Sequence, residues 1–465
     1  MLRSLIAATA LAVLTLTLAG QDTLPASQQA RVDALTQHAL DTLGAPSASI
    51  AIVEGDQLVY AHAYGQGRIQ PPEAATASMR YSVGSISKQF TAAAVLLLQE
   101  QGRLKLDDRL AKYLPGYTRA NEVTLSELLS HTSGYEDYAP QDYMIPAWLQ
   151  PTTPLAVVNH WARLPLNFDP GTQWQYSNTN YKLAGLVVEK VSGQPLFQFL
   201  TRHIFQPLAM NGIVNLNQTW VGPEDAQGTI RHALGPARVA SHTAPGWDFG
   251  DGELAMTPAT LALWQISLLR QSVLKPVSYR ELETEVPLKN GMPTGYALGL
   301  DVGRRHGHRF YSHSGEEIGF EAMEYVFPDD HAAVVVLTNQ SANNTAPVLA
   351  GEIADAILPA AAETPGDDVT AAARKILIGL QQGRIDRSLL TRNADFYFDA
   401  QTLADFQSSL APLGPPLSFT LLRQSERGGM TFRAFRAVFQ ARTVEISTYQ
   451  MPDGKWEQFL VLPQE

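Results

Sequence analysis

Residues 85–101 of this chain read SISKQFTAAAVLLLQEQ, a short polar turn that leads into a long apolar stretch closed by Gly102. Apolar side chains on every face of a helix indicate burial inside a large domain. Ser85 and Lys88 stand three residues apart where this helix begins, so their side chains share one face. The stretch is therefore expected to be a buried helix with a serine–lysine pair at its N-terminal end.

This serine–lysine pair has a specific chemical meaning. A serine hydroxyl is a poor nucleophile until a base takes its proton. A lysine amine serves as that base only if burial or nearby positive charge lowers its pKa. The positive potential of a helix start and apolar neighbours such as Ile86, Phe90 and Val95 act in this direction. Ser85 is thus a candidate nucleophile and Lys88 a candidate base.

The same S-x-x-K spacing occurs a second time, at Ser272-Val273-Leu274-Lys275. There Pro276 follows the lysine and disfavours helical geometry at Lys275. The one-turn alignment of the two side chains is then lost, and we interpret this copy as coincidental.

Two further motifs carry polar groups that fit the same chemistry. Tyr176-Ser177-Asn178 precedes a helical stretch, and His313-Ser314-Gly315 stands at the end of a late strand. A phenol beside a lysine can relay a proton, and an amide can hold a substrate carbonyl or orient the lysine. Glycine lets a substrate backbone approach, and the N–H groups of Glu316 and Ser85 can form an oxyanion hole. Each motif alone is ordinary, whereas the three in this order are specific.

Composition places the chain among ordinary globular proteins. Its 465 residues favour two or three domains, and 45% are hydrophobic and 17% charged. The chain has no cysteine, which excludes disulfides, thiolate metal sites and a cysteine nucleophile. The net charge of −11 disfavours nucleic acid and anionic membranes as partners. A small-molecule or peptide substrate remains the expected partner, and the oligomeric state stays open.

The first twenty residues differ from the rest. Arg3 provides a short positive region, Leu5 to Leu18 form an apolar run, and Ala19-Gly20 are small. This order is typical of a signal peptide, and the run is short for a membrane span. We expect residues 1–20 to be removed and the mature protein to be secreted or periplasmic, without stable membrane insertion. A retained anchor is the alternative.

Hydrophobic patterns predict an α+β fold. Helices are expected at 27–43 and 345–358, with little strand character between 110 and 260. Strands are expected at both ends of this region, which predicts one antiparallel sheet with helices inserted in the middle of the chain. The expected strands are Ser47–Val53, Gln57–Tyr64, Tyr296–Gly303, Phe310–Ser314, Gly319–Phe327 and Ala332–Asn339.

A second, smaller domain is expected at the C-terminal end. Residues 363–368 read ETPGDD and resemble a linker, so the first domain is expected to span 21–362. Helical stretches at 369–383 and 400–410 precede four probable strands. Residues 369–465 therefore read as a small α+β domain with an antiparallel sheet, for which the sequence indicates no role.

Beyond the three motifs, several other stretches point to a family. They are YSVG at 81–84, LDD at 106–108, TLSELLSHTSG at 124–134, FDPG at 168–171 and GF at 319–320. With these stretches the chain, over about residues 30–358, resembles the serine β-lactamase-related hydrolases. That family includes class C β-lactamases, D-alanyl-D-alanine carboxypeptidases, D-aminopeptidases and esterases.

The resemblance implies both a fold and a set of roles. The fold would be an antiparallel sheet flanked by helices, with a mainly helical subdomain. Ser85 would be the nucleophile, Lys88 its base or the partner of its base, and Tyr176 a proton shuttle used again in deacylation. Asn178 and His313 would border the substrate. His131 and Ser133 invite a triad interpretation, but in the family that stretch is structural.

One departure from the family bears on the substrate. Most true β-lactamases have lysine where this chain has His313, and a neutral histidine offers less to a substrate carboxylate. Glu316 and Glu317 follow and add negative charge. We therefore expect an exported hydrolase acting through an acyl-enzyme on an ester, peptide or D-amino-acid amide. The alternatives are a true β-lactamase, a non-catalytic binding or sensor protein of the same fold, and a self-assembling structural protein.

Three histidines raise the possibility of a metal site. His306, His308 and His313 lie close together in the sequence. No carboxylate stands at a recognised ligand spacing, and no H-E-x-x-H motif is present. A solvated basic turn that begins at Arg304-Arg305 is the plainer interpretation, and the sequence predicts neither a metal nor another cofactor.

Overall fold

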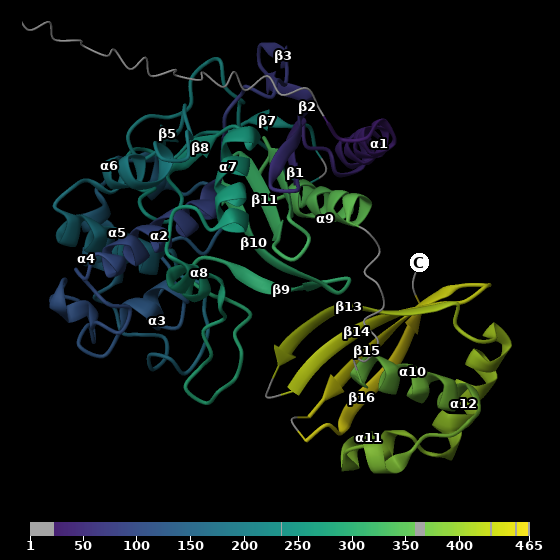
Figure 1. Cartoon of the computed structure of the whole chain (residues 1–465). Coiled ribbons are helices and arrows are strands. Elements are labelled where there is room, and N and C mark those ends of the chain that lie inside the picture. The colour runs from purple at the N-terminus through teal and green to yellow at the C-terminus, as the bar shows by residue number, and fades with distance from the viewer. Residues whose placement is uncertain (1–22, 234, 359–367, 428–429, 452, 464–465) are drawn as a thin grey trace, which may run out of the picture.

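The computed structural model describes residues 23–233, 235–358, 368–427, 430–451 and 453–463. The expected leader at 1–20 lies outside these residues, as does the expected linker apart from its last residue. The described chain forms a larger α+β part up to residue 358 and a smaller one from residue 368 (Figure 1). No helix within the described ranges is long and apolar enough to cross a membrane.

A seven-stranded antiparallel sheet forms the centre of the larger part. Its described strands pair in the order β3-β2-β1-β12-β11-β10-β9. The middle pair joins the two ends of this part of the chain, with Ile50 opposite Val336. The predicted antiparallel sheet built from both ends is therefore confirmed. The strands are β1 (Ser47–Glu54), β2 (Gln57–Ile69), β3 (Pro72–Ala74), β9 (Asp301–Arg305), β10 (His308–Glu317), β11 (Phe320–Phe327) and β12 (Ala332–Thr338).

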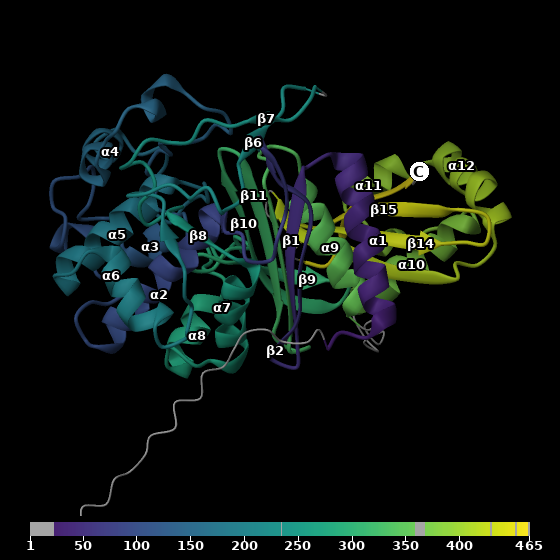
Figure 2. The ribbon, with the colours of Figure 1, turned by 90° about the horizontal axis from the view of Figure 1, so that it is seen from above.

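Both faces of this sheet are covered, which explains the continuous apolar runs in its central strands. Val334 and Val336 of β12 point to one face, where they pack against helices α1 (Ala26–Leu43) and α9 (Thr345–Ile357). Val335 points to the opposite face and joins the larger core. Figure 2 shows α1 and α9 on one side of the sheet and the remaining helices of this part on the other.

The predicted buried helix lies in the centre of the larger hydrophobic core. Helix α2 (Ser87–Glu100) is buried from Ser87 to Leu96 and packs against α5. The surrounding helices are α3 (Leu125–Leu129), α4 (Pro154–Trp161), α5 (Asn178–Ser192), α6 (Leu196–Leu200), α7 (Pro258–Arg270) and α8 (Pro276–Glu283). The predicted mainly helical middle of the chain is thus present.

Short strand pairings fix the turn that precedes α2. Strand β4 (Tyr81–Ser82) pairs with β8 (Leu254–Met256), which also pairs with β5 (Val214–Asn215). The Val83 N–H extends this ladder by donating to Leu254 O over 3.0 Å. The loop just before β8 is thereby held beside the turn that carries Ser85. A further pair, β6 (Thr229–Ile230) and β7 (Arg238–Val239), lies apart from this ladder.

Two expectations about individual segments have definite outcomes. The strand expected from Tyr296 begins only at Asp301, because the chain turns at Gly299, whose φ is +80°. Lys275 is extended and precedes α8, with Pro276 as the first helical residue. The second S-x-x-K copy therefore has no helical alignment, as predicted.

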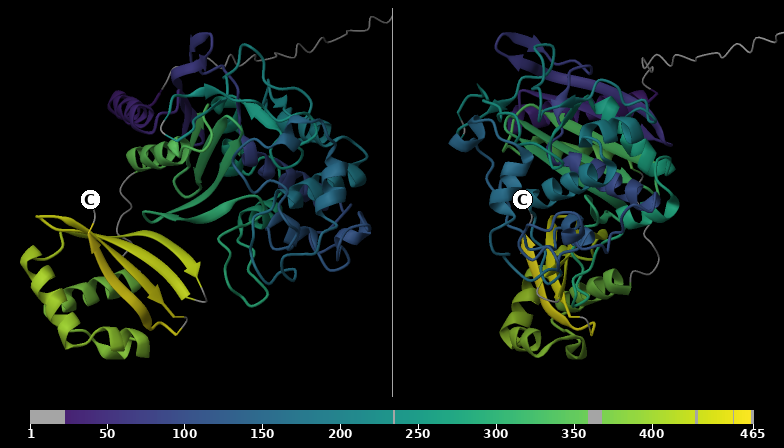
Figure 3. Two further views of the ribbon diagram at one scale, coloured as in Figure 1. Left: turned by 180° about the vertical axis from the view of Figure 1, so that it is seen from behind. Right: turned by 90° about the vertical axis from the view of Figure 1, so that its left-hand side faces the viewer.

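The smaller part has its own sheet and core. Strands β13 (Ser418–Arg427), β14 (Met430–Val438), β15 (Thr443–Gln450) and β16 (Trp456–Pro463) pair in chain order and antiparallel. One face carries α10 (Asp368–Gln381), α11 (Arg392–Tyr397) and α12 (Ala400–Leu410), of which α11 was not predicted. In the left view of Figure 3 this sheet lies near β9, and Cα atoms of β9 and β13 come within 8 Å.

The separate cores generate a prediction. The described residues of the two larger clusters end at Leu358, and those of the third begin at Val369. A chain that ends at residue 362 is therefore expected to fold, with its melting temperature within about 4 °C of the matching transition in the full chain. Calorimetry measures this directly. A truncated chain that aggregates or melts without cooperativity would show that the β9–β13 contact is essential.

Candidate active site

The predicted nucleophile lies at the base of a cavity. Ser85 is the middle residue of a single 3₁₀ turn, Gly84–Ile86, that leads into α2. Between Tyr81 and Phe90 it is the one residue that is not buried. Its side chain lines a cavity of about 560 Å³. The turn thus presents one hydroxyl to the cavity while everything around it belongs to the core.

The Lys88 amine lies beneath this hydroxyl and is completely buried. Nζ is 2.8 Å from Ser85 Oγ. It donates hydrogen bonds to Asn178 Oδ1 over 2.7 Å and to the main-chain oxygen of Asp251 over 2.8 Å. Three segments of the chain, α2, α5 and the loop before β8, therefore meet at one nitrogen atom.

This coordination determines what the amine can do. Burial lowers the pKa of Lys88 to about 8, although Asp251 and Asp137 counteract the effect. A neutral amine has two N–H donors and one lone pair. Because the Asn178 and Asp251 oxygens can only accept, they take both donors of the neutral form. The lone pair then points at Ser85 Oγ, where a base must be.

Tyr176 lies on the other side of the serine. Its ring centroid is 4.9 Å from Lys88 Nζ, and it lines the cavity together with Ser85. Burial raises the pKa of Tyr176 well above 10, although the nearby Ser85 side chain acts in the opposite direction. The phenol therefore keeps its proton at neutral pH, and it can donate a proton but does not begin as a base. Lys88 is the better candidate for the first proton transfer.

Asn178 is the first residue of α5, and its side chain connects the lysine to an acid. Its Oδ1 accepts from Lys88, while Nδ2 donates to Asp137 Oδ2 over 3.3 Å. Its main-chain N–H donates to Asp137 Oδ1 over 2.9 Å. Of the two roles that the sequence allowed, orientation of the lysine is the one that these contacts support.

His313 lies in the middle of β10, which continues beyond the predicted strand to Glu317. Its Nδ1 faces the carbonyl oxygen of Ser314 and must donate to it, so Nε2 accepts from the Tyr296 hydroxyl over 2.8 Å. Burial lowers the pKa of His313 to about 3, and the ring is neutral. The ring lines the cavity, but both of its nitrogens are used within the protein.

The glycine of the third motif is required by the protein's own backbone. A Cβ atom on Gly315 would lie 1.9 Å from Val83 O, and one on Gly84 would lie 2.6 Å from Glu316 N. Strand β10 and the serine turn therefore touch through two glycines. This contact sets the Glu316 N–H beside the turn that carries Ser85, as an oxyanion hole requires.

His131 holds the loop of Tyr176 in place. Its main-chain oxygen accepts from Gln175 N over 3.0 Å, and its Nδ1 accepts from Ser177 N over 3.2 Å. Its ring lies 4.3 Å from the Tyr176 ring, centroid to centroid, and is fully buried. Both neighbours of Tyr176 are thus attached to His131. The nearby Ser133 hydroxyl donates to Asn180, so these contacts support the structural role expected for this stretch.

The cavity is acidic. Among its described lining residues there is no lysine or arginine. Its carboxyl groups belong to Asp137, Asp142, Asp248, Asp251, Asp301, Glu316 and Glu317. Burial raises the pKa of Asp301 and of Glu316 to about 7. It also raises the pKa values of Asp248 and Glu317, which lie side by side. These groups would ionise more easily next to a bound cation.

The two histidines of the basic turn contact two different carboxylates. His308 Nδ1 is 2.8 Å from Asp330 Oδ2, and His306 Nε2 is 3.4 Å from Asp355 Oδ1. Within the described ranges no group of three or more histidine, aspartate or glutamate side chains could hold a metal ion.

Five of the seven predicted site residues line the cavity, and the other two, Lys88 and Gly315, contact Ser85 and the turn that carries it; the structure adds others that the sequence analysis missed. The missed residues are Asp137, Tyr138, Lys182, Asp251 and Tyr296. Lys182 follows Asn178 by four residues, so it lies on the same face of α5, and this spacing was a usable signal. Asp251 acts through its main-chain oxygen in a loop, where no side-chain pattern indicates the contact.

A serine at the start of a buried helix, with its hydroxyl facing a buried lysine of that helix, in a fold whose antiparallel sheet is flanked by helices, defines the class of serine β-lactamase-related hydrolases. The family comparison agrees, since the Beta-lactamase family model matches residues 32–358. The chain belongs to the β-lactamase family.

Individual relatives refine the comparison. Penicillin-binding protein 4* of Bacillus subtilis is 27% identical over 327 residues, which cover 65% of this chain and 71% of the relative. A D-stereospecific amidohydrolase from Streptomyces sp. is 27% identical and superposes with a TM-score of 0.60, over 71% of this chain and 99% of that one. The octameric penicillin-binding protein homologue from Pyrococcus abyssi shares only the fold, at 20% identity and a TM-score of 0.63, over 94% of this chain and 96% of that one.

The position of Lys88 predicts a pH dependence. Only the neutral amine can accept the serine proton, and the pKa of Lys88 is lowered to about 8. The rate of Ser85 acylation is therefore expected to rise with pH and reach half its maximum near pH 8. Stopped-flow measurement of p-nitrophenol release between pH 5.5 and 10 tests this. A rate that falls over this range, or a half-point below pH 6, would exclude Lys88 as the base.

The backbone contact at Gly315 predicts a local loss of function. In Gly315→Ala the new methyl group forces β10 away from Val83, and the Glu316 N–H moves with it. We expect kcat to fall about a hundredfold, the usual effect of losing one oxyanion donor. Gly116→Ala is the matched control, because its Cβ would meet nothing within 4 Å. Equal activity of the two variants would contradict the proposed position of the oxyanion hole.

Proposed function

We propose that this chain is an exported serine hydrolase that forms an acyl-enzyme on Ser85 and acts on an ester, a peptide or a D-amino-acid amide. The observation that carries the proposal is the coordination of Lys88. Its nitrogen has two fixed carbonyl acceptors and faces the hydroxyl of Ser85, the one residue of the turn that is not buried. Family membership supports hydrolysis through an acyl-enzyme.

Acylation begins when a substrate carbonyl enters the cavity above Ser85. Neutral Lys88 takes the hydroxyl proton as Oγ attacks the carbonyl carbon. The oxygen of the tetrahedral intermediate is held by the N–H groups of Ser85 and Glu316. Tyr176, which is still protonated, gives its proton to the leaving group and recovers one from Lys88. The leaving alcohol or amine departs, and the acyl group remains on Ser85.

Deacylation uses the same groups in the opposite sense. With Lys88 neutral again, a water molecule near the ester carbonyl loses its proton through Tyr176 and Lys88. The Ser85 oxygen then leaves as a hydroxyl with the proton that the lysine holds. Both halves need the amine to change its charge inside the core. A lowered pKa makes that change accessible at neutral pH.

The charge of the cavity supports a substrate without a carboxylate near the scissile bond. Seven carboxyl groups line the cavity, and the ring nitrogens of His313 are occupied. A carboxylate substrate would add negative charge where no described lining residue provides a fixed positive one. A free ammonium group would instead be attracted. Neutral or cationic esters and amides are therefore the favoured class, and β-lactams, which carry a carboxylate, are not.

Export is the remaining component of the proposal. The apolar run from Leu5 to Leu18, with Arg3 before it and Ala19-Gly20 after it, has the order of a cleavable leader. N-terminal sequencing of the mature protein tests this component independently of catalysis.

A substrate series tests the proposed chemistry and the preferred charge together. We expect hydrolysis of p-nitrophenyl butyrate by the wild-type chain and at least about a thousandfold loss in Ser85→Ala, which removes the nucleophile. For alanine p-nitroanilides of D configuration, we expect the free-amine and N-acetyl forms to exceed the N-succinyl form in kcat/KM by about tenfold or more.

Each outcome of this series has a meaning. Equal turnover by the wild-type chain and Ser85→Ala would exclude the acyl-enzyme. No turnover of any ester or amide would favour the binding or sensor protein. A preference for the succinyl form, or rapid hydrolysis of nitrocefin, would contradict the argument from the acidic cavity.

A further inference from the structure

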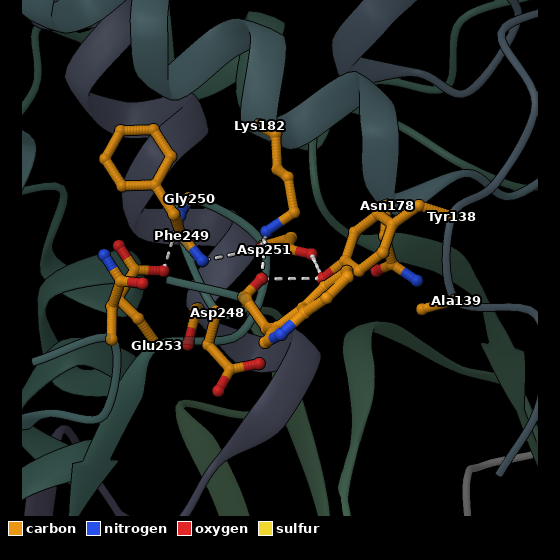
Figure 4. Close-up of polar contacts among 12 residues, drawn as sticks. Tyr138, Ala139, Asn178, Lys182, Asp248, Phe249, Gly250, Asp251 and Glu253 are labelled. Carbon is orange, nitrogen blue, oxygen red and sulfur yellow. Dashed lines mark hydrogen bonds and ion pairs between the residues drawn. The ribbon is translucent and has the colours of Figure 1, made fainter. Parts of the chain in front are cut away.

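A second lysine is buried close to the first. Lys182 of α5 is fully buried, and its Nζ lies 3.2 Å from Asp251 Oδ1. The amine also donates to the main-chain oxygen of Trp247. Figure 4 shows Lys182 and Asp251 pointing at each other from α5 and from the loop before β8. A buried ion pair often adds little to the stability of a protein, because removing both charges from water is costly. Stability alone therefore does not explain why Lys182 and Asp251 are paired here.

The carboxylate of Asp251 is held from several directions. Tyr138 Oη donates to Oδ2 over 2.6 Å, and Phe249 N donates to Oδ1 over 3.0 Å. The Lys182 amine also lies 4.4 Å from the centroid of the Tyr138 ring. The orientation of residue 251 is therefore fixed by its side chain, which has no hydrogen bond to Ser85 or Lys88 among the described contacts.

The main chain of the same residue is what touches the catalytic candidate. Asp251 O accepts from Lys88 Nζ over 2.8 Å. The other fixed acceptor, Asn178 Oδ1, lies one helical turn before Lys182 on α5. One face of α5 thus supplies one acceptor of Lys88 directly and fixes the second through the ion pair with Asp251.

The ion pair also contributes charge at Lys88. Lys182 lowers the pKa of Lys88 by repulsion, and Asp251 raises it by attraction. The other charged or titratable groups that face Lys88 are Asp137 and Glu253, the rings of Tyr176 and Tyr181, and the buried His131 and His313. Of these, Asp137 and Glu253 act in the same direction as Asp251.

We propose that Lys182 and Asp251 are positioning residues for the reaction at Ser85: together they orient the Asp251 carbonyl on Lys88 and balance the charge around its amine. The proposal rests on the proposed function, because it assigns Lys88 as the base. It goes beyond that function by making base strength depend on a buried pair that touches neither Ser85 nor the reacting carbonyl. Neither residue was part of the predicted site.

A phosphonylation assay tests the pair without a natural substrate. An alkyl fluorophosphonate reacts when Ser85 Oγ attacks phosphorus, the P–F bond breaks, fluoride leaves and Lys88 takes the hydroxyl proton. The second-order rate against pH then reports the strength of the base. Deacylation and substrate fit do not enter, so failure to turn over esters or amides does not affect the reading.

The two single variants are expected to shift the pH profile in opposite directions. Lys182→Met removes a repelling charge, so the half-point of the profile moves up by about one pH unit. Asp251→Asn removes an attracting charge, so the half-point moves down by about the same amount. A merely structural role would lower the rate in both variants without shifting either half-point.

The double variant separates position from charge. Lys182→Met/Asp251→Asn keeps the side-chain shapes and removes both charges. Its half-point is expected within about 0.5 pH units of the wild-type value, with a maximal rate about tenfold lower because the Asp251 carbonyl is less firmly held.

Tyr138→Phe removes one hydrogen bond from Asp251 and leaves both charges. It is expected to lower the maximal rate with the half-point unchanged. If the charge variants do not fold, the reading comes from comparing it with Asp225→Asn, a destabilised variant away from Lys88 that is expected to keep the maximal rate.

A matched control distinguishes these effects from general destabilisation. Asp225 is also buried, accepts from Arg80 over 2.7 Å, and is not among the groups that shift Lys88. Asp225→Asn is expected to lower the melting temperature without moving the half-point. Three results would overturn the proposal. The half-points of both single variants could move in one direction, or they could stay unchanged in variants that fold. The maximal rate could also stay unchanged in the double variant and in Tyr138→Phe. A wild-type Ser85 inert to the reagent at every pH would overturn it together with the role of Lys88.

Discussion

An amine nitrogen with no access to water must find all its hydrogen-bond partners inside the protein, and Lys88 meets this requirement with three oxygen atoms. Two of them, on Asn178 and Asp251, can only accept, so the neutral amine has its lone pair left for Ser85. Helix α2, the start of α5 and the loop before β8 are far apart in the sequence, and the sheet β4-β8 and the packing of α2 on α5 bring them together. The core of the larger part thus places Lys88, the proposed base, beneath the Ser85 hydroxyl.

The same burial explains the electrostatics around the site. Desolvation lowers the pKa values of Lys88 and His313 and raises that of Tyr176, so all three are available in uncharged form near neutral pH. The acids of the cavity wall experience the same desolvation. A site in which the imidazole and the phenol are neutral, and the amine can lose its proton close to neutral pH, suits proton relay, and its acidic wall attracts positive charge. It is poorly suited to binding a carboxylate.

Much of the fold followed from local patterns. The run of apolar residues after Ser85 predicted α2, and the apolar strands such as Ala332–Thr338 predicted the sheet, because burial on both faces leaves no polar alternation to confuse the pattern. The prediction that a strand begins at Tyr296 was wrong because a glycine turn interrupts an otherwise strand-like composition.

At the site, side chains in motifs could be predicted from the sequence. The carbonyl of Asp251 could not, since a main-chain contact leaves no residue type to recognise. His131 shows the converse, because a histidine beside a serine resembles a catalytic pair until its contacts to the Tyr176 loop are known.

The central claim is that Ser85 carries the acyl group, and trapping that group tests it most directly. After mixing with p-nitrophenyl trimethylacetate and quenching in acid, tryptic cleavage releases residues 81–88 as one peptide, since Arg80 and Lys88 flank it. The account predicts the mass of the acyl group on this peptide, with fragment ions that place it on Ser85 and not on Ser82 or Ser87. An adduct on Ser314, the other serine that lines the cavity, or on no serine at all, would contradict this claim.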